Sequence, residues 1–173
     1  SESTVSIVDM FGSHIIWEFG RITTLNISGA YSLSYDDGGT YNIPLFSIPS
    51  SIQNLTALKH LSITNNDLDT LPDNICNLES LESFFIHNNN LNAIPACIGD
   101  LDKVESFSAK NNNLISLPNG ICNLSNLHSF WVLHNNLTTI PECICNMGSN
   151  VEHIQIDVRY NCLSEEYNYG CID

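Results

Sequence analysis

The feature that most constrains this chain is an internal repeat of 23 residues. It begins at Leu58, and equivalent apolar positions follow at Leu81, Val104 and Leu127. The copies read LKHLSITNNDLDTLPDNICNLES, LESFFIHNNNLNAIPACIGDLDK, VESFSAKNNNLISLPNGICNLSN and LHSFWVLHNNLTTIPECICNMGS. A regular period of this length indicates one supersecondary unit per copy, stacked so that neighbouring units share a continuous core.

Each copy predicts a strand followed by a turn. The opening apolar residues alternate, as in Leu61 and Ile63 or Phe84 and Ile86, which is the period of a strand with one buried face. An asparagine then recurs, and its side-chain amide can satisfy backbone groups of neighbouring coils where the chain turns. These asparagines are Asn66, Asn89, Asn112, Asn135 and, after a three-residue insertion, Asn161.

The second half of each copy predicts a short helical turn. Apolar residues stand three and six positions after a recurring proline. This spacing suits one helical or 3₁₀ turn that starts at the proline and faces the core. With a strand on one side and a turn on the other, the stack is expected to curve. The prolines are Pro49, Pro72, Pro95, Pro118 and Pro141.

This pattern resembles the leucine-rich repeat, LxxLxLxxNxLxxLPxxIxxLxx, closely over residues 48–147 and loosely over 21–33 and 153–163. The resemblance implies an α/β fold class: a right-handed leucine-rich-repeat solenoid of about six coils. Its curved parallel β-sheet would form the concave face, and short helical or 3₁₀ turns the convex face. The segment WEFGRITTLNISG, from Trp17 to Gly29, is similar to the start of plant-type extracellular members. Residues 1–57 lack the cysteine pair of plant-type caps, and the repeats lack the glycine of the plant LxGxIP form.

We expect a single domain, with terminal caps covering the apolar edges of the stack. Its expected parts are the N-terminal cap (1–20), the first coil (21–57), the regular repeats (58–152), and the last coil with the C-terminal cap (153–173).

Two segments interrupt the repeat pattern. The alternating stretch TVSIVDM predicts a cap strand over the first coil, or alternatively an edge that pairs with another molecule. An insertion at 34–45 is interpreted as an ordinary surface loop, because Asp36 and Asp37 alone fall short of a calcium site.

Four of the seven cysteines form two matched pairs in adjacent coils. Cys76 and Cys122 follow their prolines by four residues, whereas Cys97 and Cys143 follow theirs by two. Strands of neighbouring coils lie about 4.8 Å apart, and disulfides join Cα atoms separated by about 4.4–6.8 Å. The spacing therefore predicts disulfides Cys76–Cys97 and Cys122–Cys143.

The other three cysteines are less constrained by spacing. Cys145 would pair with Cys171 in the C-terminal cap and leave Cys162 over; the alternative is Cys162–Cys171 with Cys145 free. One buried free cysteine is the simplest reading of the odd count, and an intermolecular bond is the alternative. No Cys-x₂-Cys pair occurs, so no zinc or other metal site is expected.

Composition and sequons narrow the class of protein. Five basic residues against 19 acidic ones give a net charge of -14, which argues against nucleic acid or anionic lipid as the main partner. No apolar run approaches the roughly 18 residues of a membrane helix, so no membrane insertion is expected. The cysteines and four Asn-x-Ser/Thr sequons predict a secreted, extracellular or cell-surface glycoprotein. The predicted glycosylation sites are Asn26, Asn54, Asn123 and Asn136.

No signature of catalysis is present in the sequence. It lacks a phosphate-binding glycine loop, a His-Glu-x-x-His helix and a Gly-x-Ser-x-Gly elbow. His87 and His134 fall two coils apart and are interpreted as surface binding residues rather than a catalytic pair. We therefore expect no enzyme activity, no catalytic residue and no cofactor.

Strand alternation predicts which side chains point outward from the sheet. One outward column holds Asn26, Ser62, Phe85, Ser108, Trp131 and Asp157. The next holds Ser28, Thr64, His87, Lys110, Leu133 and Arg159. Phe85 and Trp131 flank Ser108, about 10 Å apart over two strand spacings, and exposed aromatics beside cations are typical binding anchors. The predicted ligand-binding residues are Phe85, His87, Lys110, Trp131, Leu133 and Arg159, with His60 and Tyr160 at the margin.

Three functional hypotheses follow. The first is an extracellular module whose concave sheet binds a protein, peptide or glycan, as the family resemblance implies. The second is a glycosylated structural subunit that associates with copies of itself through its N-terminal strand, its coil ends or a spare cysteine. The third is a hydrolase inhibitor or an ice-binding protein, as known among plant-type relatives, although no regular Thr ladder is present. An alternative for Phe85 and Trp131 is that they pair across strands or pack beneath a loop or glycan.

Overall fold

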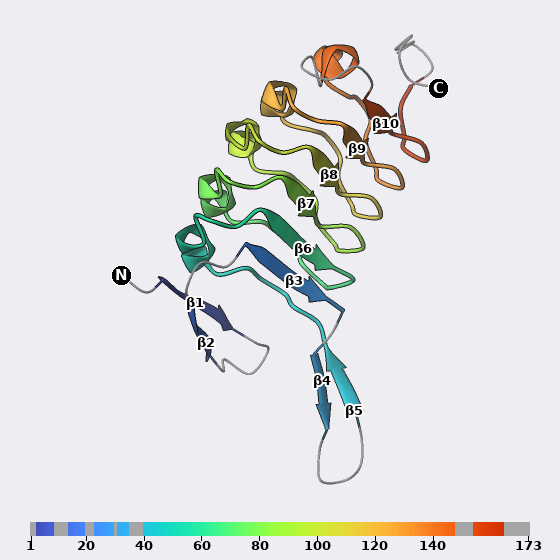
Figure 1. Cartoon of the computed structure of the whole chain (residues 1–173). Coiled ribbons are helices and arrows are strands. Elements are labelled where there is room, and N and C mark those ends of the chain that lie inside the picture. The colour runs from blue at the N-terminus through green and yellow to red at the C-terminus, as the bar shows by residue number, and fades with distance from the viewer. Residues whose placement is uncertain are drawn as a thin grey trace.

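The computed structural model describes residues 3–8, 14–19, 23–29, 31–34, 40–147 and 154–164. Its centre is a parallel sheet of six strands in the order β10-β9-β8-β7-β6-β3. Figure 1 shows the coils stacked side by side, with the strands along one face and single helical turns along the other. The predicted solenoid, with a sheet on the concave face and 3₁₀ turns on the convex face, is confirmed.

Every coil contributes one short strand and one short turn. The strands of the central sheet are β3 (Thr24–Ser28), β6 (His60–Thr64), β7 (Ser83–Phe85), β8 (Ser106–Ser108), β9 (Ser129–Trp131) and β10 (Gln155–Asp157). The 3₁₀ helices are η1 (Ser50–Asn54), η2 (Asp73–Asn77), η3 (Ala96–Asp100), η4 (Asn119–Asn123) and η5 (Glu142–Asn146). Within the described part of the chain, no helix has the length and apolar character needed to cross a membrane.

The core consists of rows of identical positions that run perpendicular to the strands. Leu61, Phe84, Phe107 and Phe130 occupy one row in register, and none is more than 1% exposed. The ring centroid of Phe107 lies 5.7 Å from the ring centroid of Phe84 and 5.7 Å from that of Phe130. Such aromatic neighbours stabilise the stack by about 0.5–1.5 kcal/mol per pair beyond the burial of their area. The continuous spine expected from the 23-residue period is therefore present.

A second buried row consists of the repeated asparagines, and Asn112 is representative. Its Nδ2 donates to the carbonyl oxygens of Ile86 (3.1 Å) and Ala109 (3.0 Å), while its Oδ1 accepts from the N–H of Leu91 (3.0 Å). One side chain thus satisfies the backbone of its own coil and the preceding one, as predicted, where an unmet buried group would cost about 1–3 kcal/mol. The same arrangement recurs at Asn66, Asn89, Asn135 and Asn161.

The residue before each of these asparagines has a left-handed backbone. Asn65, Asn88 and Asn111 have φ of 57°, 58° and 53°, a region that asparagine tolerates better than most residues. Their side chains form an amide ladder, in which Asn88 donates to Asn65 and Asn111 to Asn88, both at 2.6 Å. In the last two coils His134 and Tyr160 occupy this position, with φ of 54° and 57°.

Two disulfides join neighbouring 3₁₀ helices on the convex face. Cys76–Cys97 joins η2 to η3 with Cα atoms 5.9 Å apart, and Cys122–Cys143 joins η4 to η5 with Cα atoms 5.8 Å apart. Both pairings are those predicted from the cysteine spacing. Of Cys145 only the backbone is described, and Cys171 lies outside the described residues, so the pairing proposed between them remains a prediction.

The joint between η3 and η4 is built differently. Among the described cysteines, no disulfide spans it. Instead, Gly99 and Gly120 let the two helical turns approach so closely that a Cβ on Gly99 would collide with the carbonyl oxygen of Gly120. Close backbone contact at this joint therefore depends on glycine.

Cys162, in the turn after β10, is a free cysteine. The expectation of one buried free thiol is wrong for this residue, because its side chain is exposed. It follows Asn161, at a position where the preceding coils carry polar, solvent-facing residues.

The N-terminal region contains two hairpins outside the central sheet. β1 (Ser3–Val8) pairs with β2 (His14–Phe19) in an antiparallel register and contacts η1, so the expected cap strand is half of a hairpin. β4 (Tyr31–Ser34) and β5 (Thr40–Ile43) form a second antiparallel hairpin that projects from the first coil in Figure 1. The insertion at 34–45 therefore includes the strand β5, and its interpretation as an ordinary surface segment without a calcium site stays a prediction.

Candidate recognition surface

The two outward columns predicted from strand alternation are aligned across the sheet. Phe85 pairs with Ser108 and Ser108 with Trp131 in the strand register. Beyond the strands, the N–H of Asn88 donates to the carbonyl of Lys110 at 3.0 Å, and this keeps the second column in register. We use the term concave patch for the six residues Phe85, His87, Ser108, Lys110, Trp131 and Leu133.

Ser108 lies at the centre of the concave patch but is not open to solvent. Its side chain was predicted to point outward, yet it is 2% exposed. The partly buried side chains of Phe85 and Trp131 occupy the same column on either side, and at a strand spacing of about 4.8 Å large rings can shield a small neighbour. Its Oγ is buried and has no hydrogen-bond partner among the described residues. A hydroxyl in that condition is unfavourable for the free protein.

The second unsatisfied polar atom of the concave patch belongs to His87. Its ring centroid lies 6.4 Å from that of Phe85, and its Nδ1 is buried without a hydrogen-bond partner in the described chain. Burial lowers the pKa of His87 below its ordinary value, and the positive charge of Lys110 lowers it further. The imidazole is therefore held neutral near pH 7, available to donate or accept one hydrogen bond.

Lys110 differs from Lys59 and Arg159, two basic residues near the sheet that make ion pairs. The Nζ of Lys59 lies 2.6 Å from an oxygen of Glu82, and Arg159 is paired with Asp157 at 2.7 Å. Lys110 is half-buried and makes no ion pair with any described residue. The concave patch thus carries one uncompensated positive charge in a chain with a net charge of -14.

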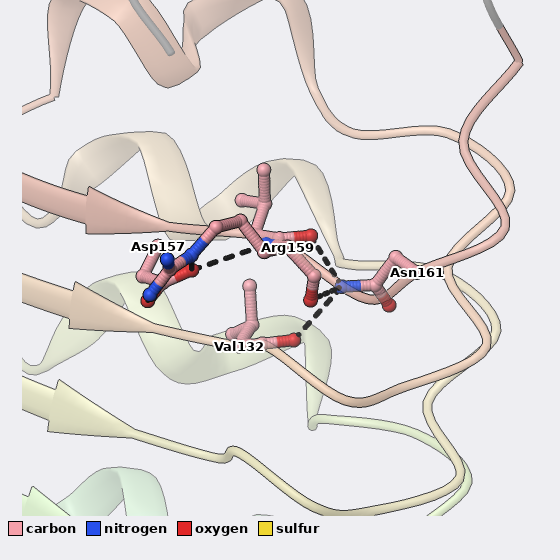
Figure 2. A network of polar contacts seen from close by, with 5 residues as sticks. Val132, Asp157, Arg159 and Asn161 are labelled. Carbon is pink, nitrogen blue, oxygen red and sulfur yellow. Dashed lines mark hydrogen bonds and ion pairs between the residues drawn. The ribbon is translucent and has the colours of Figure 1, made fainter. Parts of the chain in front are cut away.

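Arg159 is engaged within its own coil, as Figure 2 shows. Its Nε donates to Oδ1 of Asp157 at 2.9 Å, and its terminal nitrogen donates to Oδ2 at 2.7 Å. The hydrogen bond with Arg159 lowers the pKa of Asp157, and the same contact raises the pKa of Arg159. Arg159 therefore lies in the predicted column but does not offer an uncompensated charge.

An aromatic pair near the C-terminal end was not predicted. The rings of His134 and Tyr160 stack with centroids 4.3 Å apart and an interplanar angle of 2°. Alignment of the repeats could have revealed it, because both residues occupy the left-handed position held by asparagine in earlier coils. Tyr160 is 65% exposed, so the stack extends the surface next to Arg159.

The predicted residues do not all meet. His60 starts β6, where its Nδ1 lies 3.2 Å from Oγ of Ser83, and it belongs to a different column from the concave patch. Thr64, in the second outward column, is buried, and Asn65 donates to its hydroxyl at 3.3 Å. The side chain of Ser28 and the whole of Asp36 and Asp37 lie outside the described residues. No group of three or more potential metal ligands occurs among the side chains that are described.

Sequence comparison identifies the family. Residues 47–167 match the family described as a leucine-rich repeat region. The chain therefore belongs to the leucine-rich-repeat family. Among curated proteins, none matches the chain by sequence.

Several solved leucine-rich-repeat structures are similar to the chain. A leucine-rich-repeat protein of Leptospira interrogans has a TM-score of 0.69 and 27% identity, over 77% of this chain and 36% of that one. The ectodomain of the Arabidopsis thaliana receptor kinase GASSHO1/SCHENGEN3, in complex with Casparian strip integrity factor 2, has a TM-score of 0.61 and 26% identity, over 68% and 14%. The plant peptide hormone receptor RGFR1, in complex with RGF2, has a TM-score of 0.62 and 27% identity, over 82% and 21%. The chain thus spans well under half the length of each of these proteins.

Proposed function

We propose that this chain is a non-enzymatic extracellular module that binds a protein or peptide through its concave patch. One observation carries the proposal: Phe85 and Trp131 keep large aromatic side chains partly accessible on the sheet, on either side of Ser108. Tryptophan, tyrosine and arginine dominate binding hot spots, and an aromatic ring loses little conformational entropy when it is covered.

The similar structures support a peptide ligand. GASSHO1/SCHENGEN3 and RGFR1 were each solved in complex with a partner, Casparian strip integrity factor 2 and RGF2 respectively, and RGFR1 is described as a peptide hormone receptor. A sheet built from short parallel strands offers an extended partner a row of side chains from several coils. Phe85, Ser108 and Trp131 form such a row across three strands.

Disulfides and sequons support an extracellular location. Cross-links such as Cys76–Cys97 persist in oxidising compartments. The asparagines of all four sequons are exposed, as N-glycosylation requires. Asn26 lies on β3, two strands from Phe85, so a glycan there would cover the first coil and leave the concave patch accessible. The exposed positions are Asn26, Asn54, Asn123 and Asn136.

The test is a selection with the intact, disulfide-bonded chain as bait. Random linear peptides displayed on phage are enriched on the wild type and counter-selected on Trp131→Ala. We expect peptides whose affinity falls about 30-fold on Trp131→Ala, because a tryptophan hot spot contributes about 2 kcal/mol. Phe85→Ala should weaken the same peptides.

Ile115→Ala is the matched control, since Ile115 is a 57% exposed apolar residue outside the outward columns. It should leave affinity unchanged, and circular dichroism should show that all variants are folded. If no peptide distinguishes the wild type from Trp131→Ala, the concave patch is not the recognition surface.

A second candidate function is self-association, and the exposed free thiol of Cys162 favours it. An exposed cysteine in an oxidising compartment can join two chains through a disulfide. Light scattering of the glycosylated protein distinguishes the two functions. A monomer at micromolar concentration favours recognition, whereas an oligomer that dissociates in reductant and is absent in Cys162→Ser favours assembly.

A further inference from the structure

The concave patch contains polar atoms whose burial is unfavourable unless a ligand meets them. Oγ of Ser108 and Nδ1 of His87 are both buried without a hydrogen-bond partner among the described residues, in adjacent coils of the same patch. Native proteins leave few such atoms, and each one requires an explanation. Replacing the hydroxyl by hydrogen would remove the penalty, so the free protein alone gives no reason for a serine at position 108.

The charge beside these atoms indicates what a ligand would carry. Lys110 follows Ser108 by two residues in the same coil and faces the same side, and it has no acidic partner among the described residues. The described acid of the first outward column, Asp157, is already bound by Arg159. A carboxylate is the complementary group for a half-buried ammonium with polar neighbours.

We propose that the concave patch binds a peptide segment with an aspartate or glutamate side chain next to an apolar one. The carboxylate pairs with Lys110, the segment's polar groups hydrogen-bond with Ser108 and His87, and the apolar side chain packs on Trp131 and Leu133. This inference rests on the proposed recognition function and specifies the chemistry of its ligand.

The position of Lys110 favours a side-chain carboxylate over the end of a peptide. Lys110 has His87 on one side of its column and Leu133 on the other, so the patch continues in both directions. Three strands span about 10 Å, which an extended chain crosses in about three residues. A segment that uses the whole width of the patch therefore passes Lys110 instead of ending there.

Ser108 lies between Phe85 and Trp131 in the strand register, and side chains of that size can cover the hydroxyl of a small neighbour. The rings of Phe85 and Trp131 are only partly buried, so rotation about their side-chain bonds can uncover the hydroxyl. Binding would then exchange a shielded, unpaired Oγ for a paired one. Serine at position 108 thus improves the complex at the expense of the free protein.

The experiment uses the phage-displayed peptides that depend on Trp131. We expect their consensus to contain Asp or Glu, and the affinity of the leading synthetic peptide to fall about tenfold on Lys110→Gln. Lys103→Gln is the matched control, since Lys103 is exposed, lies before β8 and gives the same change in net charge. Changing the peptide's acid to its amide should cost about tenfold on the wild type and nothing further on Lys110→Gln.

Ser108→Ala provides a readout that a purely structural role would not give. We expect affinity for the peptide to fall about fivefold while the midpoint of urea unfolding stays the same or rises. A lower midpoint would show that the hydroxyl stabilises the free protein and would overturn its role as a ligand group.

The proposed function and this inference can fail separately. Trp131-dependent peptides without an acidic residue, or an equal effect of Lys110→Gln and Lys103→Gln, would overturn the acidic-ligand inference and leave the recognition function standing. Peptides that require a free C-terminus near Lys110 would overturn the side-chain source of the carboxylate. A library without any Trp131-dependent binder would overturn both.

Discussion

Removal of one asparagine from the buried row tests how the coils are joined. In Asn112→Ala the N–H of Leu91 loses its partner and has no other among the described residues. The three carbonyls that Asn112 also contacts keep second donors: Ile86 accepts from Asn89, Ala109 from Asn135, and Lys110 from the N–H of Asn88. The buried N–H therefore dominates the loss.

The expected loss of stability follows from the hydrogen bonds that Asn112→Ala removes. An orphaned buried N–H costs about 2 kcal/mol, and the three weakened carbonyl contacts add about 0.5 kcal/mol each, so the free energy of unfolding should fall by about 3–4 kcal/mol. This is a large share of the 5–15 kcal/mol typical of a domain. Urea unfolding with the disulfides intact, followed by circular dichroism, measures the change.

Asn161→Ala is the matched control. Asn161 makes the same bonds in the last coil, to the carbonyl of Val132 at 3.1 Å and the N–H of Leu137 at 3.0 Å, as Figure 2 shows for the first of these. It is only half-buried, so water can replace those bonds, and we expect a loss of about 1 kcal/mol. Equal losses in the two variants, or a loss below about 1 kcal/mol for Asn112→Ala, would refute the role of the buried row.

Three further predictions concern His87 and the disulfide Cys76–Cys97 on the convex face. Burial, and to a smaller extent the charge of Lys110, lowers the pKa of His87, so an NMR titration should give a midpoint below 6.5. Lys110→Gln should raise the pKa of His87 only part of the way back to its ordinary value. A return to the full ordinary value would show that burial is not the main cause. Because the pKa of His87 is lowered in the folded state, the stability contributed by the neutral imidazole is fully present above pH 6.5 and declines as the pH falls from that value toward the pKa of the folded state. Urea unfolding of His87→Gln should therefore depend less on pH in that range. Replacing both Cys76 and Cys97 by serine removes a cross-link between residues 21 apart and should lower the free energy of unfolding by about 3 kcal/mol; an unchanged urea midpoint would contradict this.

The sequence predicted the parts of the fold that repeat. The row from Leu61 to Phe130, the buried asparagines and the two disulfides all depend on equivalent positions lying side by side, and a 23-residue period determines that geometry. The register of Phe85, Ser108 and Trp131 follows for the same reason. These features needed no knowledge of how individual side chains pack.

Features that depend on a particular neighbour were not predictable in this way. Alternation places Ser108 on the outer face, but its burial depends on the size of the side chains in the coils beside it. The Arg159–Asp157 pair arises within one coil and neutralises a charge that the pattern alone shows as available. The hairpins β1–β2 and β4–β5 precede the regular copies, so no second copy existed from which their pairing could be read.

The distribution of cross-links on the convex face gives the molecule two covalently reinforced blocks. One contains η2 and η3, the other η4 and η5, and the boundary between them passes between β7 and β8. The concave patch straddles that boundary, with Phe85 on one block and Ser108 on the other. A ligand that contacts both Phe85 and Ser108 would join the two blocks non-covalently. The force needed to separate β7 from β8 should therefore be higher when the concave patch is occupied than when it is empty.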